Sequence, residues 1–498
     1  MLTSSNWHQN QRLRRLTAVL AAIVCVLACL PLTAADKKPL SPLDRARLVI
    51  AKTQPLEVER GKRMPFIVWP LRNLTAKTDA ELEDVLRKLS DRGMATVIGW
   101  NTRNREASLK EALRSAAIHK KLGIPVVVDS TSVMNLFFNG DESTAHVAAD
   151  GEKFFDMSQS KRIKIGCPFA VKDRYDAIRE QVEYFVAGYK NAGMSLDIVV
   201  ADWEIDGPIE WNDSWAHAKR CVRCRKNIVN IQNFGEFQAA YRIIRSDMQR
   251  ECYAKVVLQH FPSALVGNYA VYPHQGMRYW YDYFEKNAAD DHPYVADQQA
   301  RYRPWFHEYS LCNYTFGMPV VYTWYRTFEW YDFKNADYRW FYNMLLVASN
   351  AGRSAGPDTP LITFVHWHTT APPKDATPVQ QFSEDAYQEL LWHMLLRGHD
   401  GLAMWCMRDE LVKETRLVQE VYAASLRYKE FLDHGVPICF DTPKQPGPVV
   451  SGLRWGNRVL VRRTDFEPAT GPVKLTVGGQ TLSVPRVSGH CQILQLDP

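Results

Sequence analysis

The chain of 498 residues is long enough for one large domain and a smaller one, and its hydrophobic fraction of 46% can fill a substantial core. The formal net charge is +6, and the charged residues form no basic arm or acidic tail. This mild charge argues against a nucleic-acid partner.

The N-terminus resembles a secretory signal. Three arginines between residues 12 and 15 precede an apolar stretch, Leu16–Leu32, which is followed by the small residues Thr33-Ala34-Ala35. We therefore predict that residues 1–35 form a signal peptide and that the mature protein is secreted or periplasmic, with no stable membrane span after cleavage. Loss of the three arginines lowers the net charge from +6 to about +3. Cleavage before Cys29 is the alternative, and it would give a lipid-anchored form.

Residues 36–436 alternate between short apolar runs and helical patterns. The helical patterns are Ala80–Arg92, Ser108–Leu122, Arg174–Ala192, Glu236–Arg250 and Ala386–Leu396, and Gly93, Gly123 and Gly193 each follow a helix as a left-handed end residue would. The runs are rich in β-branched and aromatic residues, as buried parallel strands are. They are Phe66–Trp69, Ala95–Trp100, Ile124–Asp129, Leu196–Glu204, Lys255–Phe261, Met318–Trp324, Leu361–His368 and Gly401–Met407.

Eight strands alternating with helices predict an α/β fold, a (β/α)8 TIM barrel. A doubly wound open sheet is the competing fold, but it usually has fewer strands, and the first run is followed by no glycine-rich phosphate loop. Residues 437–498 instead show short alternating runs separated by turns, and they predict a small C-terminal antiparallel β-domain. These runs are Val449–Gly452, Arg458–Arg463, Val473–Val477, Gln480–Val484 and Gln492–Gln495.

In a barrel, the residues at the carboxyl ends of the strands surround the active site. Many of these residues are aromatic, and aromatic rings stack on the apolar faces of sugars. We therefore predict a polysaccharide or glycan substrate, although any single ring could instead pack a strand onto a helix. The predicted substrate-binding residues are Trp69, Trp100, Asp129, His260, Tyr269, Tyr272, Trp324, His366 and Trp405.

The fourth strand ends in two carboxylates, Asp202 and Glu204. Side chains two residues apart on a strand point to the same face, roughly 7 Å apart along it. Mutual repulsion favours retention of one proton near neutral pH, which suits a general acid beside a charged stabiliser. The alternative is structural, with both acids capping the strand and pairing with basic residues.

Most glycosidases place two acids on either side of the scissile bond, but the seventh strand ends in Phe364-Val365-His366-Trp367-His368 without a carboxylate. Two acids on one strand suit substrate-assisted cleavage, in which the 2-acetamido group of the sugar is the nucleophile. The hypothesis requires no metal and no cofactor.

The Asp-x-Glu ending of this strand resembles the hyaluronidase family and, more distantly, chitinases and endo-β-N-acetylglucosaminidases. The loop Gly267–Pro273, Tyr322 on the sixth strand and Trp405 on the eighth are similar to that family's site. The resemblance implies that Glu204 is the general acid and base, with a raised pKa, and that Asp202 orients the acetamido group. It also implies that Tyr322 binds the acetamido oxygen and that Trp405 closes the pocket. The chain departs from the family at Ile205, where a basic continuation is usual, and lacks the cysteine-rich C-terminal module.

Three other functions remain open. A retaining glycosidase could take its nucleophile from a loop, with Glu329, Asp332, Asp409 or Glu410 as candidates. A metallohydrolase could use His366 and His368 with Asp129, Asp202 and His260. A barrel of the same kind could also bind sugar without cleaving it.

The motif Cys221-Val222-Arg223-Cys224 is a single CxxC pair. A zinc site usually needs a second pair at matching spacing, and the sequence has none. We therefore expect a local disulfide or two structural thiols here.

Overall fold

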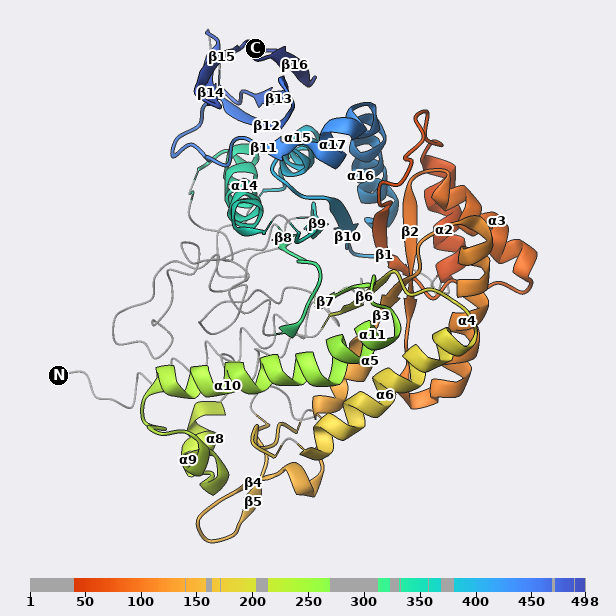
Figure 1. Ribbon diagram of the computed structural model, residues 1–498, viewed down its shortest axis with the longest axis vertical. Helices are drawn as coiled ribbons and strands as arrows, with labels where there is room; N and C mark the ends of the chain where they lie inside the picture. Colours follow the sequence, from red (N-terminus) through yellow and green to blue (C-terminus); the bar gives the residue numbers. More distant parts are fainter. Residues whose placement is uncertain are drawn as a thin grey trace, which may run out of the picture.

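The computed structural model describes residues 40–497 except 139, 158–163, 171, 203–213, 269–311, 323–330, 332, 357, 369–379, 468–470 and 488. Its centre is an eight-stranded, all-parallel sheet in the order β7-β6-β3-β2-β1-β10-β9-β8 (Figure 1). The strands are β1 (Phe66–Arg72), β2 (Met94–Gly99), β3 (Val127–Asp129), β6 (Ile198–Ala201), β7 (Leu265–Asn268), β8 (Val320–Tyr322), β9 (Ile362–His366) and β10 (Gly401–Met404).

This order is the cyclic order of a (β/α)8 barrel, because the first strand pairs with the last: Ile67 lies opposite Ala403. The two terminal strands of the sheet, β7 and β8, meet through Thr315, which lies just before β8. The Thr315 amide donates to the Val266 carbonyl at 3.0 Å, and the Thr315 hydroxyl accepts from the Val266 amide at 2.8 Å. These bonds bridge the seam, so the predicted TIM-barrel fold is confirmed.

The described helices are α2 (Pro42–Lys52), α3 (Asp79–Ser90), α4 (Arg105–Leu122), α5 (Thr131–Met134), α6 (Lys172–Asn191), α8 (Ser214–Arg220), α9 (Val222–Asn227), α10 (Phe234–Gln249), α11 (Lys255–His260), α14 (Ala336–Ser354), α15 (Glu384–Leu395), α16 (Leu411–Ser425) and α17 (Lys429–His434). Most of them lie on the outside of the barrel, whereas α8 and α9 lie away from the sheet, beyond α10 (Figure 1). None of the described helices is long and apolar enough to cross a membrane.

The prediction of a strand at Lys255–Phe261 is wrong. This segment is helix α11, which continues α10 through a π-helical turn at Arg250–Ala254, and the fifth strand is β7. A short apolar run does not distinguish a strand from a buried helix, and Val256 and Val257 are buried in the same core cluster as α6.

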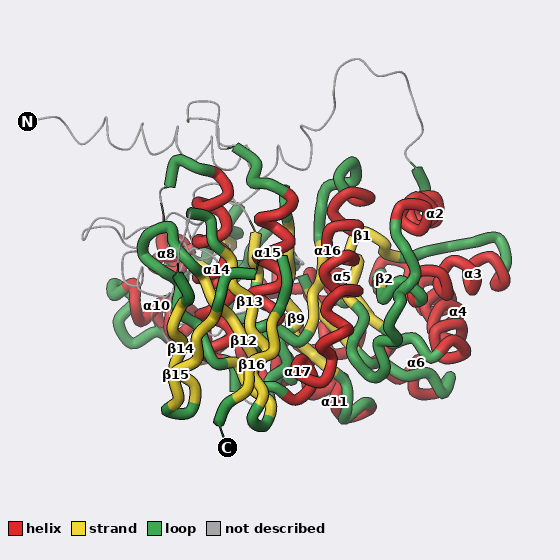
Figure 2. The backbone as a smooth tube through the Cα atoms, turned by 90° about the horizontal axis from the view of Figure 1, so that it is seen from above, coloured by secondary structure: helices red, strands yellow, loops and turns green. Residues whose placement is uncertain are grey.

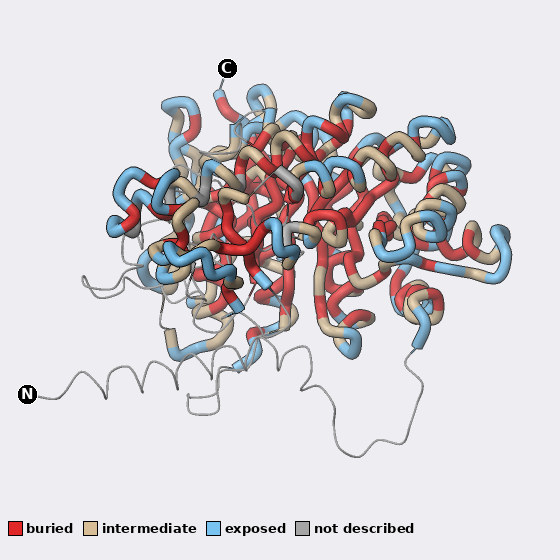
Figure 3. The backbone as a smooth tube through the Cα atoms, turned by 90° about the horizontal axis from the view of Figure 1, so that it is seen from below, coloured by how far each residue is buried: buried red, intermediate tan, exposed pale blue. Residues whose placement is uncertain are grey.

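Along β2, β3 and β6 the buried side chains fall into two sets, one on each face of the sheet. Residues such as Val97, Val127 and Val200 belong to one cluster of buried side chains, and their neighbours Ile98, Val128 and Val199 belong to a second cluster with α6. Successive side chains of a strand point to opposite faces, so the first set faces the barrel interior and the second faces the helices. Figure 3 shows the buried residues concentrated at the centre of the molecule and the exposed residues around its periphery.

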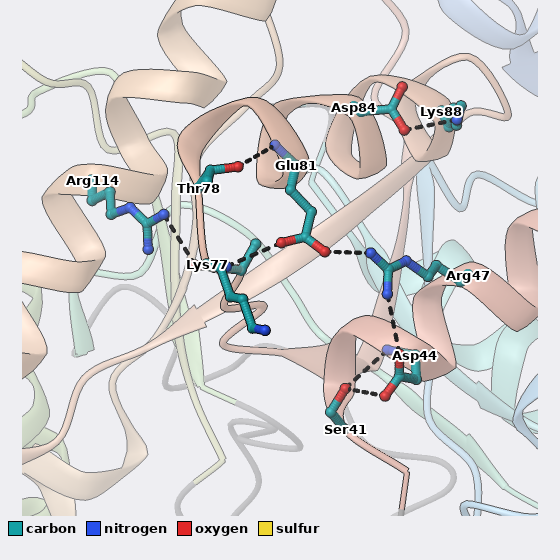
Figure 4. Close-up of polar contacts among 10 residues, drawn as sticks. Ser41, Asp44, Arg47, Lys77, Thr78, Glu81, Asp84, Lys88 and Arg114 are labelled. Atoms are coloured by element: carbon teal, nitrogen blue, oxygen red, sulfur yellow. Dashed lines mark hydrogen bonds and ion pairs between the residues drawn. The ribbon is translucent and has the colours of Figure 1, made fainter.

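Polar contacts fasten the first described helix, α2, to α3 (Figure 4). The Ser41 hydroxyl caps α2 by accepting from the Asp44 amide at 3.1 Å, and the Thr78 hydroxyl caps α3 by accepting from the Glu81 amide at 3.2 Å. Arg47 of α2 then pairs with Glu81 of α3. Each cap satisfies a helix-end amide, which is typically worth about 1 kcal/mol.

The C-terminal segment forms small antiparallel sheets, as predicted. One contains β11 (Val436–Pro437), β12 (Val449–Trp455), β13 (Arg458–Thr464) and β16 (Gln492–Gln495), and the other is the hairpin of β14 (Val473–Val477) and β15 (Gln480–Val484). The larger sheet lies beside α15 (Figure 2). There the His393 ring bonds the hydroxyls of Ser451 and Thr464, at 2.7 and 2.9 Å, so buried polar contacts join the sheet to the barrel.

Candidate active site

Four aromatic side chains lie at one level on four neighbouring strands. Tyr322 is paired in register with His366, and the β9–β10 and β10–β1 registers place Trp405 and Trp69 at the same level. Side chains in register on parallel strands point the same way. These residues therefore face the barrel interior together, at the carboxyl ends of β8, β9, β10 and β1.

The rings contact one another closely. Tyr322 stacks on Trp405 with ring centroids 5.8 Å apart, and His366 meets the edges of both rings at 5.6 and 5.0 Å. Trp69 packs edge-on against Phe364, one layer deeper, at 5.2 Å. Tyr322 and Trp69 are buried, whereas Trp405 is partly exposed, so Trp405 is the ring most accessible to a ligand.

A buried carboxylate of α16 holds the end of β9. Glu414 is fully buried, and it accepts the Trp367 amide at 2.6 Å and the Tyr387 hydroxyl at 3.2 Å. Its other oxygen lies 3.2 Å from Nδ1 of His366. Burial and the neighbouring Glu414 raise the pKa of Tyr387 well above its usual value, so the tyrosine remains a hydrogen-bond donor. Glu414 thereby fixes the orientation of the His366 ring.

A second, polar group lies at the ends of β1, β3 and β6. Arg72 forms an ion pair with Asp129, whose side chain is completely buried. The other oxygen of Asp129 accepts from both the amide and the hydroxyl of Thr131, the amide at 2.9 Å. The Thr131 hydroxyl in turn accepts the Asp202 amide at 2.7 Å. A continuous chain of contacts thus positions the backbone of Asp202.

Arg72 occupies this position partly because β2 ends in a glycine. The Gly99 amide donates to the Asn73 side-chain oxygen at 2.7 Å, and a Cβ at residue 99 would lie only 3.0 Å from the Asn73 amide nitrogen and 3.2 Å from Arg72. Glycine allows the β1 end to cross closely over β2.

The structure brings together part of the predicted site. Asp202, Asp129, Tyr322, Trp405, Trp69 and His366 all lie at the carboxyl ends of the strands. Four other predicted residues, Glu204, Tyr269, Tyr272 and Trp324, lie outside the described residues, as do the loop acids Glu329 and Asp332.

Two predicted substrate-binding residues lie elsewhere. Trp100 faces outward and stacks on Phe185 of α6 at 4.8 Å, with 2% of its surface exposed, so it packs the helix layer. His260 ends helix α11, which leads into the amino end of β7, and its Nε2 lies 2.8 Å from Glu183. The first assignment is wrong because Trp100 has the same strand parity as outward-facing Ile98, and the second is wrong because Lys255–Phe261 is not a strand.

The metal set of the metallohydrolase alternative does not assemble, because His260 lies at the opposite end of the barrel and Asp129 is paired with Arg72. Within the described part of the chain, the group with metal-ligand geometry is a different one: His146, Cys167, Cys221 and Cys224. Cys221 and Cys224 are buried thiols with no disulfide between them, which is the second of the two arrangements expected for this pair.

A cavity of about 220 Å³ lies between α4 and the sheet, lined by Thr96 and Ile98 of β2 and by Ala112 and Ser115 of α4. The cavity lies outside the barrel wall, and its lining includes neither Trp405 nor Asp202.

Sequence patterns did not predict Thr131, Glu414 or the pairing of Arg72 with Asp129. Arg72 is recognisable in the sequence as a cation close to the end of the first strand, but the sequence does not identify Asp129 as its partner. Glu414 carries no local signal, because its partner His366 is 48 residues away in the chain. Thr131 has a local partner in Asp129, but nothing local indicates that its hydroxyl also accepts the Asp202 amide, 71 residues away.

No protein-family model matches the chain, and no curated protein matches it. Solved structures resemble it distantly. A GH36 α-galactosidase from Geobacillus stearothermophilus is 10% identical with a TM-score of 0.43, over 91% of this chain and 57% of that one. An isomaltulose synthase from Protaminobacter rubrum is 8% identical with a TM-score of 0.43, over 84% and 90% of the two chains. An endo-β-1,4-mannanase from Cellulomonas fimi is 11% identical with a TM-score of 0.32, over 91% and 92%. Scores below 0.5 carry no argument about the activity of this chain.

Proposed function

We propose that the chain is a glycoside hydrolase that cleaves a glycan at a 2-acetamido sugar by a substrate-assisted, retaining mechanism. The observation that carries the proposal is that the carboxyl end of the barrel has an aromatic side and, opposite it, an acidic side. Partly exposed Trp405, backed by Tyr322 and His366, provides an aromatic wall, and Asp202 directly follows β6, which lies opposite β10 in the cyclic strand order. A sugar stacked on Trp405 would therefore face the end of β6, where Asp202 lies.

The proposed roles follow from this arrangement. Glu204 protonates the glycosidic oxygen as the bond to the anomeric carbon breaks, while the acetamido oxygen of the same sugar attacks that carbon. Asp202 accepts the acetamido N–H and stabilises the positive oxazolinium intermediate. Water, deprotonated by Glu204, then opens this intermediate and restores the starting protonation state. Tyr322 donates its hydroxyl to the acetamido oxygen.

The contacts around Asp202 support this role. Arg72 is paired with Asp129, and Asp129 is further held by Thr131, so the acidic residue next to Asp202 is fixed in place. Thr131 anchors the Asp202 backbone at the carboxyl end of β6. Such a fixed charge stabilises a cation without reorganisation during the reaction.

The test is hydrolysis of a panel of 2-acetamido and neutral glycans by the wild type and by Glu204→Gln and Asp202→Asn. We expect cleavage of acetamido glycans, inhibition by a thiazoline mimic of the oxazolinium ion, and loss of activity by about 10²-fold or more in both variants. Asp409→Asn and Glu410→Gln are matched controls that should remain active. Cleavage of neutral sugars that is insensitive to the mimic and lost in a control variant would assign the nucleophile to the loop after β10 instead.

The non-catalytic alternative is separated by measuring binding as well as turnover. Glu204→Gln should bind acetamido glycans as the wild type does but no longer release product. A wild type that binds the panel and never cleaves it would refute hydrolysis.

We also propose that the protein is exported after removal of residues 1–35. The apolar stretch behind the arginines supports this. Mass spectrometry of the mature chain should give an N-terminus at Asp36, and an N-terminus at a lipid-modified Cys29 would instead establish membrane anchoring.

A further inference from the structure

Four buried metal-ligand side chains meet away from the barrel mouth. The ligand atoms of His146, Cys167, Cys221 and Cys224 all lie within 4.8 Å of one another. The Sγ atom of Cys167 lies 3.6 Å from that of Cys224 and 3.7 Å from that of Cys221, and Nδ1 of His146 lies 4.0 Å from the Cys224 sulfur. All four side chains are at most 3% exposed.

These separations match the edges of a zinc tetrahedron. Zinc–sulfur bonds of about 2.3 Å place two sulfurs about 3.8 Å apart, and a zinc–nitrogen bond of about 2.0 Å gives a sulfur–nitrogen edge of about 3.5 Å. The separations from Cys167 are far longer than a disulfide bond, which is about 2.05 Å. Three thiols and an imidazole form one of the ligand sets typical of structural zinc.

We propose that His146, Cys167, Cys221 and Cys224 bind one structural Zn²⁺ ion. Four protein ligands complete the coordination of the metal and leave no position for a substrate. The metal therefore stabilises the folded structure and takes no part in catalysis. This inference does not depend on the proposed hydrolysis. It corrects the sequence-based view of the CxxC pair: the pair has two further ligands, which come from distant parts of the chain.

The backbone around the group is preorganised. His146 lies on strand β4 (His146–Val147), which pairs with β5 (Lys153–Phe154), and its ring stacks on Phe154 at 5.1 Å. The Cys167 amide donates to the Thr144 carbonyl at 2.7 Å. Cys221 begins α9, directly after α8. The ligands are therefore supplied by a hairpin, a loop and a helix start that already contact one another, beside α8 and α9 in Figure 1.

The site lies in a small hydrophobic cluster of its own. Ala218, Ile228, Ile231 and Phe237 surround the three cysteines, and this cluster is separate from the two that enclose the barrel sheet. A core of this size supplies little stability by itself, and small units of this kind commonly depend on a metal.

Zinc at this position would connect two segments that extend away from the barrel. His146 and Cys167 lie in the segment between β3 and β6, whereas Cys221 and Cys224 follow β6. The metal would thus link the helices α8 and α9, which follow β6, to the hairpin and loop that follow β3.

The direct test is the metal content of the purified full chain by inductively coupled plasma mass spectrometry. We expect one equivalent of zinc in the wild type and in Cys439→Ser, a cysteine variant outside the group, and a loss of at least tenfold in Cys221→Ser and Cys224→Ser. Protein purified from cobalt-supplemented medium should show thiolate-to-cobalt charge transfer and the absorption of tetrahedral cobalt.

A chelator supplies a second measurement that does not need a folded variant. It should lower the melting temperature of the wild type and of Cys439→Ser alike. A folded wild-type chain that contains no metal, and in which Cys167, Cys221 and Cys224 all react with thiol reagents, would refute the site. A disulfide between any two of these cysteines in that chain, or iron in place of zinc, would also overturn the proposal.

Discussion

Thr131 offers the sharpest test of the chain of polar contacts that runs from Arg72 to Asp202 at the carboxyl end of the barrel. Its hydroxyl donates to Asp129 and accepts the Asp202 amide, so it connects β3 to the end of β6. Thr131→Val keeps the shape of the side chain and removes both bonds. Thr131→Ser keeps the hydroxyl and removes only a methyl group.

The magnitude follows from the two bonds. A hydrogen bond to a charged carboxylate contributes about 1.5–3 kcal/mol and a neutral one about 0.5–1.5 kcal/mol, so Thr131→Val should lower the free energy of unfolding by about 2–4 kcal/mol. Loss of one methyl group from a half-buried residue should cost Thr131→Ser less than about 1 kcal/mol. The unfolding entropy of a chain this long is on the order of 1 kcal/mol/K, so the valine variant should melt about 2–4 °C below the wild type.

The assay is thermal unfolding followed by circular dichroism, with glycan hydrolysis measured on the same samples. The valine variant should lose activity as well as stability, because Asp202 loses its anchor, and the serine variant should retain both. Equal losses in the two variants would show that the position tolerates neither change, so the effect could not be assigned to the hydroxyl. A valine variant with wild-type stability would refute the chain of contacts from Arg72 to Asp202.

Three further perturbations test the barrel and its pH dependence. Thr315→Val removes the hydroxyl that accepts the Val266 amide at the β7–β8 seam, and it should cost about 1–3 kcal/mol, with faster amide exchange at Val266 that Thr315→Ser does not show. Glu414→Ala removes a buried acceptor shared by Tyr387 and the end of β9, and it should cost about 2–6 kcal/mol in denaturant unfolding; a loss below 1 kcal/mol would contradict the role of this carboxylate. Burial lowers the pKa of His399 to about 4 from 6.5, so the unfolded chain binds a proton in this window that the folded chain does not. Stability is therefore lost as the pH falls from 6.5 to 4, by roughly 3 kcal/mol for this histidine, and the melting temperature of His399→Gln should depend less on pH than that of the wild type.

Local patterns in the sequence determined most of the fold. Compact β-branched runs separated by amphipathic helices predicted seven of the eight barrel strands, because a strand buried on both faces must be apolar throughout. Gly123 was predicted to end a helix, and it does so with φ +63°. The C-terminal strands followed from their alternation and turns. The segment Lys255–Phe261 was the exception, since its apolar residues suit a buried helix equally well.

The sequence also placed six residues of the candidate site at the strand ends, because strand order fixes which ends share a face. Side-chain direction was less certain: Trp100 follows the last residue of β2 and points away from the barrel interior. Partners distant in the chain could not be predicted. Cys221 and Cys224 are visible as a motif, but Cys167 is 54 residues from Cys221 and His146 is 78 residues from Cys224. Only the packing of the hairpin and loop after β3 against the helices after β6 brings these ligands together, because a burial pattern specifies which residues are inside and not which distant residues meet there.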